Sequence, residues 1–168
     1  MTYSKSYRTP DDFDDMIMYS DGENLTGLIF ARSRDERKFG ESEEKDLPVF
    51  AETERWLDEY FAGRDPGFMP AFDLGEISDF RKRVTDIMIG IPYGETITYG
   101  EIAETIAKER GIARMSAQAV GGAVGSNPIC IIVPCHRVTG SHGKITGYGG
   151  GISNKEALLK SEKNGKLK

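Results

Sequence analysis

Start and stop signals for short helices crowd the second half of the chain, and they limit the folds that this half can adopt. Four helices are predicted there: Ser78 to Ile91, a capping box at residues 98–101 to Gly111, about Ser116 to Gly125, and a second capping box at residues 153–156 onward. Glycine or proline follows three of them, where a helix normally ends. This half is therefore expected to be mainly helical.

The second and third of these helices are joined by a short segment and can form a helix-turn-helix. The third contains Gly121 and Gly122, and each glycine inside a helix costs about 1 kcal/mol relative to alanine. A face of alanine and glycine brings a helix backbone close to whatever it touches. That partner is either a binding surface or a neighbouring helix, and the small face alone does not decide between them.

The first half has a different pattern. Two β-prone runs, Met16 to Tyr19 and Leu25 to Phe30, flank an Asp-Gly-Glu-Asn turn and predict a hairpin. Apolar residues at helical spacing from Val49 to Phe61 end at Gly63, and residues 64–75 are rich in proline and glycine, as in a linker. We predict an α+β chain with an N-terminal domain at 1–76, without evident catalytic residues, and a C-terminal domain at 77–168.

Charge is divided between the two halves. Residues 1–77 carry 9 Lys and Arg against 19 Asp and Glu, whereas residues 78–168 carry 13 against 8. An acidic part joined to a basic part is typical of a nucleic-acid-binding domain with a non-binding companion, although charges can also cluster by chance.

The same totals exclude other classes of protein. No stretch approaches the roughly 18 apolar residues of a membrane span, and the first residues lack the apolar centre of a signal peptide. Two cysteines five positions apart do not form a disulfide framework. We therefore expect a cytoplasmic protein without a membrane partner.

The sequence VPCHRV at residues 133–138 places Cys135 beside His136 after an apolar run, residues 129–132, that is typical of a buried strand. A zinc site made of both cysteines and both histidines would not have the usual ligand spacing. An inert buried thiol suits Cys130, between isoleucines, better than Cys135, which two polar residues follow.

A nucleophile is the third interpretation of Cys135. A thiol must lose its proton to react, a neighbouring imidazole lowers that cost, and a carboxylate often orients the imidazole. Glu162 shares a face of the last predicted helix with Leu158 and can be that carboxylate. From spacing alone, a solvated glutamate near the C-terminus is the more common case.

From Phe80 to Glu162 the chain resembles the O6-alkylguanine-DNA alkyltransferases, also called methylated-DNA–protein-cysteine methyltransferases. The matching pieces are ITYGEIA, SAQAVGGAV, the Ser126-Asn127-Pro128 turn, IIVPCHRV and GYGGG. The first half resembles this family only in length and hairpin pattern. The resemblance implies a ribonuclease H-like N-terminal domain and a winged-helix-like C-terminal domain. It also implies a monomer that needs no cofactor or metal.

The resemblance implies a catalytic role for five residues. Cys135 would accept an alkyl group from O6 of guanine in double-stranded DNA and keep it as a thioether, so that each molecule acts once. His136, through a water, and Glu162 behind it would form the thiolate. Asn127 would tie this relay together, and Tyr99 would hydrogen-bond the base and help to protonate it.

The resemblance also implies residues that bind the base and the DNA. Around the flipped base would lie Tyr148, Gly149, Gly150, Cys130, Pro134 and Val138. The DNA contacts would be Gln118, Ala119, Gly121, Ser116, Arg114 and Thr98. A target base must leave the duplex to reach a protein thiolate, and a small-faced helix in the minor groove suits that step.

Three positions depart from the better-known members of the family. Gln118 stands where those proteins carry an arginine that fills the place of the flipped base, and Cys130 and Gly149 replace a proline and a serine of some relatives. Two other functions stay open at this point: a non-catalytic binder or regulator of alkylated DNA, and a cysteine hydrolase. The catalytic set argues against the binder, and the basic half argues against the hydrolase.

Overall fold

The N-terminal sheet is built on the predicted hairpin. In the computed structural model, which describes residues 1–165, β2 (Met16–Ser20) and β3 (Leu25–Phe30) pair in antiparallel fashion. The Asp21 carboxylate accepts the Glu23 and Asn24 amides at 2.9 and 2.8 Å and closes the turn. β1 (Tyr3–Tyr7) and β4 (Glu43–Glu44), which the sequence did not predict, complete the order β3-β2-β1-β4.

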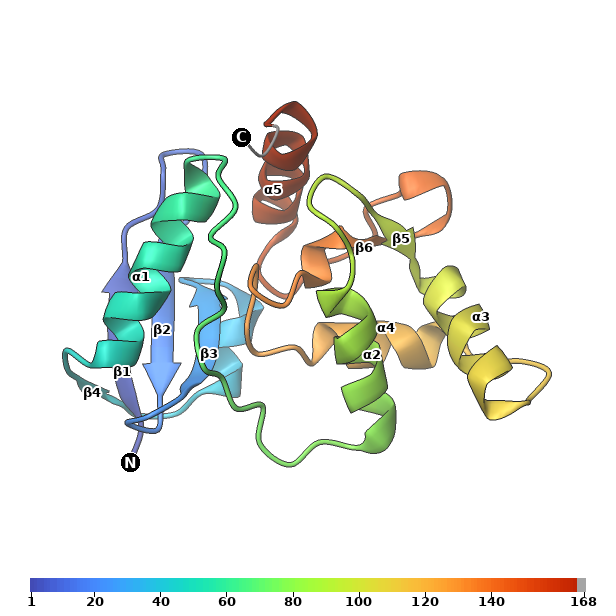
Figure 1. Ribbon diagram of the computed structural model, residues 1–168, viewed down its shortest axis with the longest axis horizontal. Helices are drawn as coiled ribbons and strands as arrows, with labels where there is room; N and C mark the ends of the chain where they lie inside the picture. The colour runs from blue at the N-terminus through green and yellow to red at the C-terminus, as the bar shows by residue number, and fades with distance from the viewer. Residues whose placement is uncertain (166–168) are drawn as a thin grey trace.

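The predicted amphipathic helix covers this sheet. α1 (Pro48–Phe61) buries Phe50, Trp56, Leu57 and Tyr60 and lies along the sheet in Figure 1. A 3-10 helix, η1 (Arg34–Lys38), follows β3 and turns toward the second half of the chain.

The predicted caps at Ser78 and Thr98 are confirmed, and the third helix begins near Ser116 as expected. Ser78 accepts the Arg81 amide at the start of α2 (Asp79–Ile89), and Ser116 accepts the Ala119 amide at the start of α4 (Ala117–Gly125). Thr98 accepts the Glu101 amide at 3.0 Å at the start of α3 (Tyr99–Arg110), which ends at Gly111 with φ +65°. α2, α3 and α4 pack against one another beside the sheet.

The predicted cap of the last helix is wrong. α5 (Ile152–Asn164) begins before Ser153, directly after Gly151, which has φ +101°. The neighbouring Asn154 side chain fixes this start instead: its Nδ2 donates to Gly150 O at 2.8 Å and its Oδ1 accepts the Asp14 amide at 3.1 Å. A contact across 140 residues therefore outweighs the local capping pattern.

The predicted buried strand at residues 129–132 is also wrong. The segment is fully buried, but it forms turns, and Ile129 alone pairs with Leu28 as an isolated bridge. The Asn127 amide clamps the turns by donating to Ile129 O and Val133 O at 3.1 and 3.0 Å, and Ile131 adopts φ +70°. The clamp bends the chain back on itself, so pairing with β3 stops after this one bridge.

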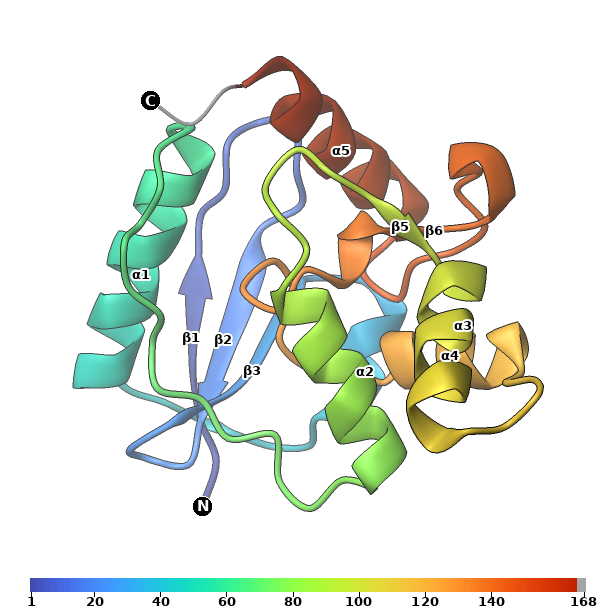
Figure 2. The same cartoon turned by 45° about the vertical axis from the view of Figure 1, so that its right-hand side comes forward.

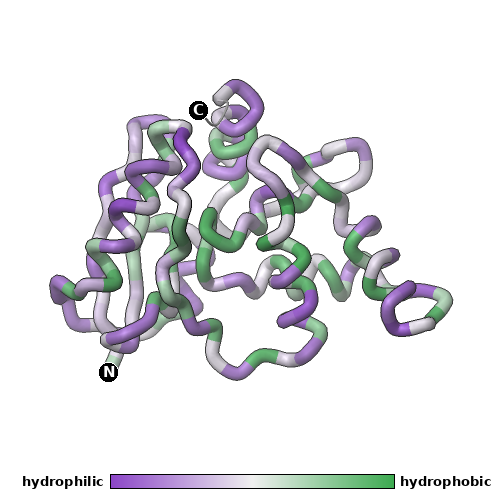
Figure 3. Tube along the Cα trace, in the orientation of Figure 1, coloured by the Kyte–Doolittle hydropathy of each residue, from purple (hydrophilic) through white to green (hydrophobic). Residues whose placement is uncertain are grey.

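This buried segment joins the two halves. Leu28 N–H donates to Pro128 O, and Cys130 N–H donates to Leu28 O, both at 2.8 Å, so residues 128–130 cover the outer edge of β3. Figure 3 shows the segment as mostly hydrophobic near the centre of the molecule, and one continuous core includes residues of both halves.

Short elements follow this buried segment. η2 (Cys135–Arg137) leads into β6 (Val138–Thr139), which pairs in parallel with β5 (Ile97–Thr98), and η3 (Ser141–Gly143) lies in the following loop. α5 lies at the junction between the sheet and the other helices in both views (Figure 1, Figure 2). Within residues 1–165, no helix has the length and apolarity needed to cross a bilayer.

Candidate active site

A cavity of about 520 Å³ opens between the two halves, and Cys135 lies in its wall. Tyr99 from the start of α3 and Gln118 and Gly121 from α4 form one side, and Tyr148 and Gly149 from the loop before α5 form another. Because Asn127 clamps the turns before it, the short helix η2 presents Cys135 to this cavity with 5% of its surface exposed.

The thiol of Cys135 is acidified by its neighbours. Hydrogen bonds from Cys130, Asn127 and Tyr148 lower its pKa to about 7, against the opposing effect of burial. The Tyr148 hydroxyl lies 3.9 Å from Cys135 Sγ. A thiol with this pKa is partly thiolate at neutral pH, and the thiolate is the nucleophilic form.

Cys130 lies behind the cavity wall rather than in it. Its side chain is 1% exposed, and its single proton has two acceptors, Asp35 Oδ2 at 3.6 Å and the sulfur of Cys135. Donation to Cys135 stabilises the thiolate and, with burial, raises the pKa of Cys130 itself. Cys130 is therefore a buried hydrogen-bond donor to the Cys135 thiolate.

His136 and Glu162 form a buried pair. His136 Nε2 lies 2.6 Å from Glu162 Oε2, and both side chains are almost completely buried. Burial lowers the pKa of His136, although Glu162 acts in the opposite direction, so the imidazole is neutral at pH 7. Since an ionised carboxylate only accepts hydrogen bonds, we assign the proton to Nε2. Nδ1 then carries a lone pair and has no partner among the described residues.

Glu162 is held by four residues besides its own helix. Arg137 donates to it from Nε at 2.8 Å and from Nη2 at 3.0 Å, and the Gly94 amide donates at 3.3 Å. The Tyr60 hydroxyl of α1 donates to Oε2 at 2.5 Å. Burial alone would raise the pKa of Glu162, but His136 and Arg137 hold it well below its usual range. The solvated glutamate that spacing favoured is therefore the wrong alternative.

Tyr99 and Gly121 both line the cavity and lie next to each other. A Cβ on Gly121 would lie 4.0 Å from the Tyr99 ring, so the helix approaches the phenol closely at this point. Burial raises the pKa of Tyr99, which keeps its hydroxyl protonated at neutral pH. The phenol can therefore donate a proton or a hydrogen bond into the cavity.

Four of the six residues expected to contact DNA are exposed. Arg114, Ser116, Gln118 and Ala119 are all exposed in or just before α4, and Thr98 is half-buried as the N-cap of α3. Gln118 also lines the cavity, as does Gly121, which is half-buried.

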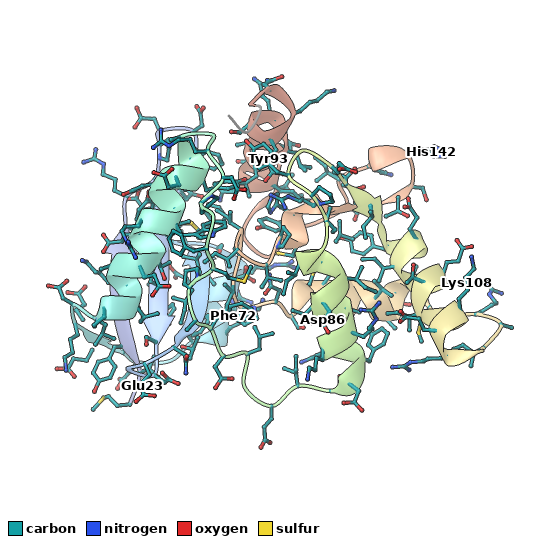
Figure 4. The ribbon with its side chains drawn as sticks, viewed as in Figure 1. Glu23, Phe72, Asp86, Tyr93, Lys108 and His142 are labelled. Carbon is teal, nitrogen blue, oxygen red and sulfur yellow. The ribbon has the colours of Figure 1, made fainter. Side chains whose placement is uncertain are left out.

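The residues expected to surround a base are only partly brought together. Tyr148 and Gly149 line the cavity with Cys135, whereas Gly150, Cys130, Pro134 and Val138 are buried outside its lining. His142 lies in the exposed loop of η3 at the edge of the molecule (Figure 4).

The first half contributes to the site, contrary to the sequence expectation. Arg34 and Asp35 of η1 line the cavity, and Tyr60 of α1 binds Glu162. Sequence reasoning also missed Lys155, a fully buried lysine that lines the cavity and donates to Val138 O at 2.7 Å. Charged residues of an acidic half carry no local signal that they face a distant cysteine, so only the tertiary structure reveals them.

Comparison with known proteins gives a consistent result. Residues 79–164 match the family described as 6-O-methylguanine DNA methyltransferase, DNA binding domain. The methylated-DNA–protein-cysteine methyltransferase of Methanosarcina acetivorans is 40% identical over 150 residues, 88% of this chain and 90% of the relative. The protein of that name from Mycobacterium tuberculosis (strain H37Rv) is 54% identical over 108 residues, which span 64% of this chain and 62% of the relative.

Solved structures agree with the sequence relatives. The structure of Mycobacterium tuberculosis OGT in complex with DNA superposes with a TM-score of 0.79 at 38% identity, covering 98% of this chain and 95% of the other. Both the mixed α+β fold and the sequence of the helical half are thus shared with these proteins. The chain belongs to the methylated-DNA–protein-cysteine methyltransferase family.

Proposed function

We propose that the protein repairs DNA by moving a methyl or small alkyl group from O6-alkylguanine in duplex DNA to its own Cys135. It would thus act as a methylated-DNA–protein-cysteine S-methyltransferase. The observation that carries this proposal is a thiol of lowered pKa in the wall of a cavity that also reaches the exposed face of α4. A reactive thiol reached from a DNA-binding surface suits transfer from a damaged base.

In the proposed transfer, the alkyl group moves in a single displacement reaction. The Cys135 proton passes, through a water, to the lone pair on His136 Nδ1, and Glu162 stabilises the imidazolium that forms. The thiolate sulfur attacks the alkyl carbon, the carbon–sulfur bond forms, and the bond to O6 breaks. The electron pair stays on guanine, which takes a proton from Tyr99, and the imidazolium of His136 returns its proton through water to the phenolate.

A thioether is stable to thiol exchange, so one molecule acts once. Cys130, the second cysteine of the chain, cannot reverse the reaction, because a thioether has no disulfide bond to attack.

The base would reach the cavity by rotating out of the duplex, which costs a few kcal/mol and less for a badly paired alkylated guanine. We infer that α4 lies in the minor groove with Ala119 and Gly121 toward the DNA. Arg114, Ser116 and Thr98 would contact the backbone, and Gln118 would fill the place of the flipped base. Such contacts tolerate any sequence, as repair requires.

The finer architecture follows the same proposal. We infer a ribonuclease H-like N-terminal domain at 1–76 and a winged-helix-like domain at 77–168 that acts as a monomer in the cytoplasm without a cofactor. The capped helices α3 and α4, packed against each other, support the helix-turn-helix.

Intact mass is the test of this function. After incubation with a duplex that contains one O6-methylguanine, the protein is expected to gain the mass of one methylene group, in one-to-one stoichiometry, on the peptide that holds Cys135. The same duplex with unmodified guanine is the control. A protein that binds the damaged duplex and gains no mass would be the non-catalytic binder or regulator.

Cys130→Ala is expected to move the pH–rate profile of Cys135 to higher pH. The Cys130 thiol donates to the thiolate, so its removal raises the pKa of Cys135 above about 7, and less thiolate is present at neutral pH. Transfer should therefore slow near pH 7 and recover as the pH rises. Cys130→Ser keeps a donor and serves as the matched control; identical profiles for the two variants would show that this hydrogen bond has no effect.

A further inference from the structure

Asp35 is a buried carboxylate of the first half that the proposed chemistry does not use. Its side chain lies in the cavity wall, 4% exposed, one side chain removed from the reactive sulfur. Oδ2 is 3.6 Å from Cys130 Sγ, and Asp35 and Cys135 line the same cavity. A group attached to the Cys135 sulfur would therefore enter the cavity that Asp35 lines.

Asp35 is held in this place by two contacts of its own and by the anchoring of its partner Lys38. Its amide donates to Gly149 O at 3.3 Å, and its Oδ1 pairs with Lys38 Nζ at 2.9 Å. Lys38 in turn donates to Gly125 O at 2.8 Å and to Asn127 O at 3.0 Å, at the end of α4. The ammonium group thereby ties η1 to the helix and to the clamp before Cys135, so Asp35 cannot swing away without breaking these bonds.

Asp35 also occupies the space that a side chain at position 149 would need. A Cβ built on Gly149 would lie 2.2 Å from Asp35 Oδ1, far inside any real contact. Gly149 has no positive φ, so its backbone would accept alanine, and the obstacle is the Asp35 side chain itself. Two positions 114 residues apart therefore compete for one volume of the cavity wall.

We propose that Asp35 is a specificity-determining residue whose volume, opposite Gly149, limits the size of the alkyl group that Cys135 accepts. This inference rests on the proposed function. A methyl group would leave the Asp35 side chain in place, whereas a bulkier group such as benzyl would press against it and against its pair with Lys38.

The first test measures the shared volume and does not depend on activity. Gly149→Ala is expected to lower the thermal unfolding midpoint by about 5 °C, because overpacking costs about 1–3 kcal/mol. In an Asp35→Ala background the same substitution is expected to lower the unfolding midpoint by less than half as much. Equal shifts in both backgrounds would overturn the idea that the two positions compete.

The second test measures selectivity. Duplexes with one O6-methylguanine or one O6-benzylguanine are reacted with each variant, and the ratio of the two transfer rates is followed by intact mass. Asp35→Ala is expected to raise the benzyl-to-methyl ratio at least about tenfold, on the scale of roughly 1–3 kcal/mol for a small change in pocket volume. Asp35→Asn keeps the volume, removes the charge and should leave the ratio within about threefold of the parent value.

The benzyl-to-methyl ratio distinguishes an effect of the volume of Asp35 from a change in the reactivity of Cys135. The charge of Asp35 raises the pKa of Cys135, so removing this charge increases the transfer rate from every substrate. This increase cancels in the ratio of the two rates. An unchanged ratio in Asp35→Ala, or an equal rise in Asp35→Asn, would overturn the role of volume. If the parent protein transferred neither group, the proposed function itself would fail, while the stability test would still stand.

Discussion

Cys135→Ser is expected to abolish alkyl transfer while the variant still binds the damaged duplex. Serine keeps the shape of the side chain, but its hydroxyl loses a proton only far above neutral pH. The neighbours that lower the pKa of the thiol to about 7 cannot lower the pKa of a hydroxyl to that range. Removing the nucleophile of a comparable site costs at least about ten-thousandfold in rate. Intact mass after incubation with O6-methylguanine DNA is the measurement.

DNA binding by this variant is the informative control. The exposed residues Arg114, Ser116 and Ala119 do not line the cavity that holds the sulfur, so the affinity for the methylated duplex should stay within about threefold of the parent value. Cys130→Ser serves as the matched substitution at the other cysteine and should still gain one methylene. A normal mass gain in Cys135→Ser would show that another residue accepts the group and would contradict the assignment.

The sequence predicted those parts of the site that local signals specify. Capping residues placed α2, α3 and α4 correctly, because a cap is a contact between residues three positions apart. The sequence also indicated Cys135, His136 and Glu162, because a reactive thiol needs an imidazole and a carboxylate beside it and the motif contains these residue types. The motif could not show that Glu162 is fully buried, since that depends on Arg137, Gly94 and Tyr60 meeting at one point.

The errors have a common physical cause, which is that a distant contact replaced a local pattern. Residues 129–132 have the composition of a strand, yet the Asn127 clamp folds them into turns. Ser153 has the spacing of a cap, yet the contact of Asn154 with Asp14 starts α5 earlier. Asp35 had no motif at all, and only the packing of η1 against residue 149 brings it to the cavity.

Glu162→Gln is expected to lower both stability and transfer. In the parent protein Glu162 is the buried counterion of Arg137 and accepts hydrogen bonds from His136 and Tyr60. Glutamine has one acceptor oxygen and adds two donors, so donors face donors and the buried guanidinium loses its counterion. Breaking a buried pair in this way costs about 3–5 kcal/mol, which in a chain of this size lowers the unfolding midpoint by roughly 6–20 °C.

The pH dependence of stability provides a second readout. The folded pKa of Glu162 is depressed, so its contribution is fully present above the unfolded value of about 4.3 and is lost as the pH falls toward the lower folded value. The parent protein should therefore lose stability more steeply in acid than Glu162→Gln does. Parallel acid profiles for the two proteins would contradict the depressed pKa.

Transfer by the folded variant should fall by about a hundredfold or more, because His136 loses the carboxylate that fixes its Nε2 proton and stabilises the imidazolium. Glu156→Gln is the matched control: it removes a carboxylate from the same helix at an exposed position and should change stability by less than about 0.5 kcal/mol. Rates are compared at a temperature where both variants are folded by circular dichroism. If Glu162→Gln then reacts as fast as Glu156→Gln, the carboxylate supports the fold and takes no part in forming the thiolate, and His136 alone must take the proton.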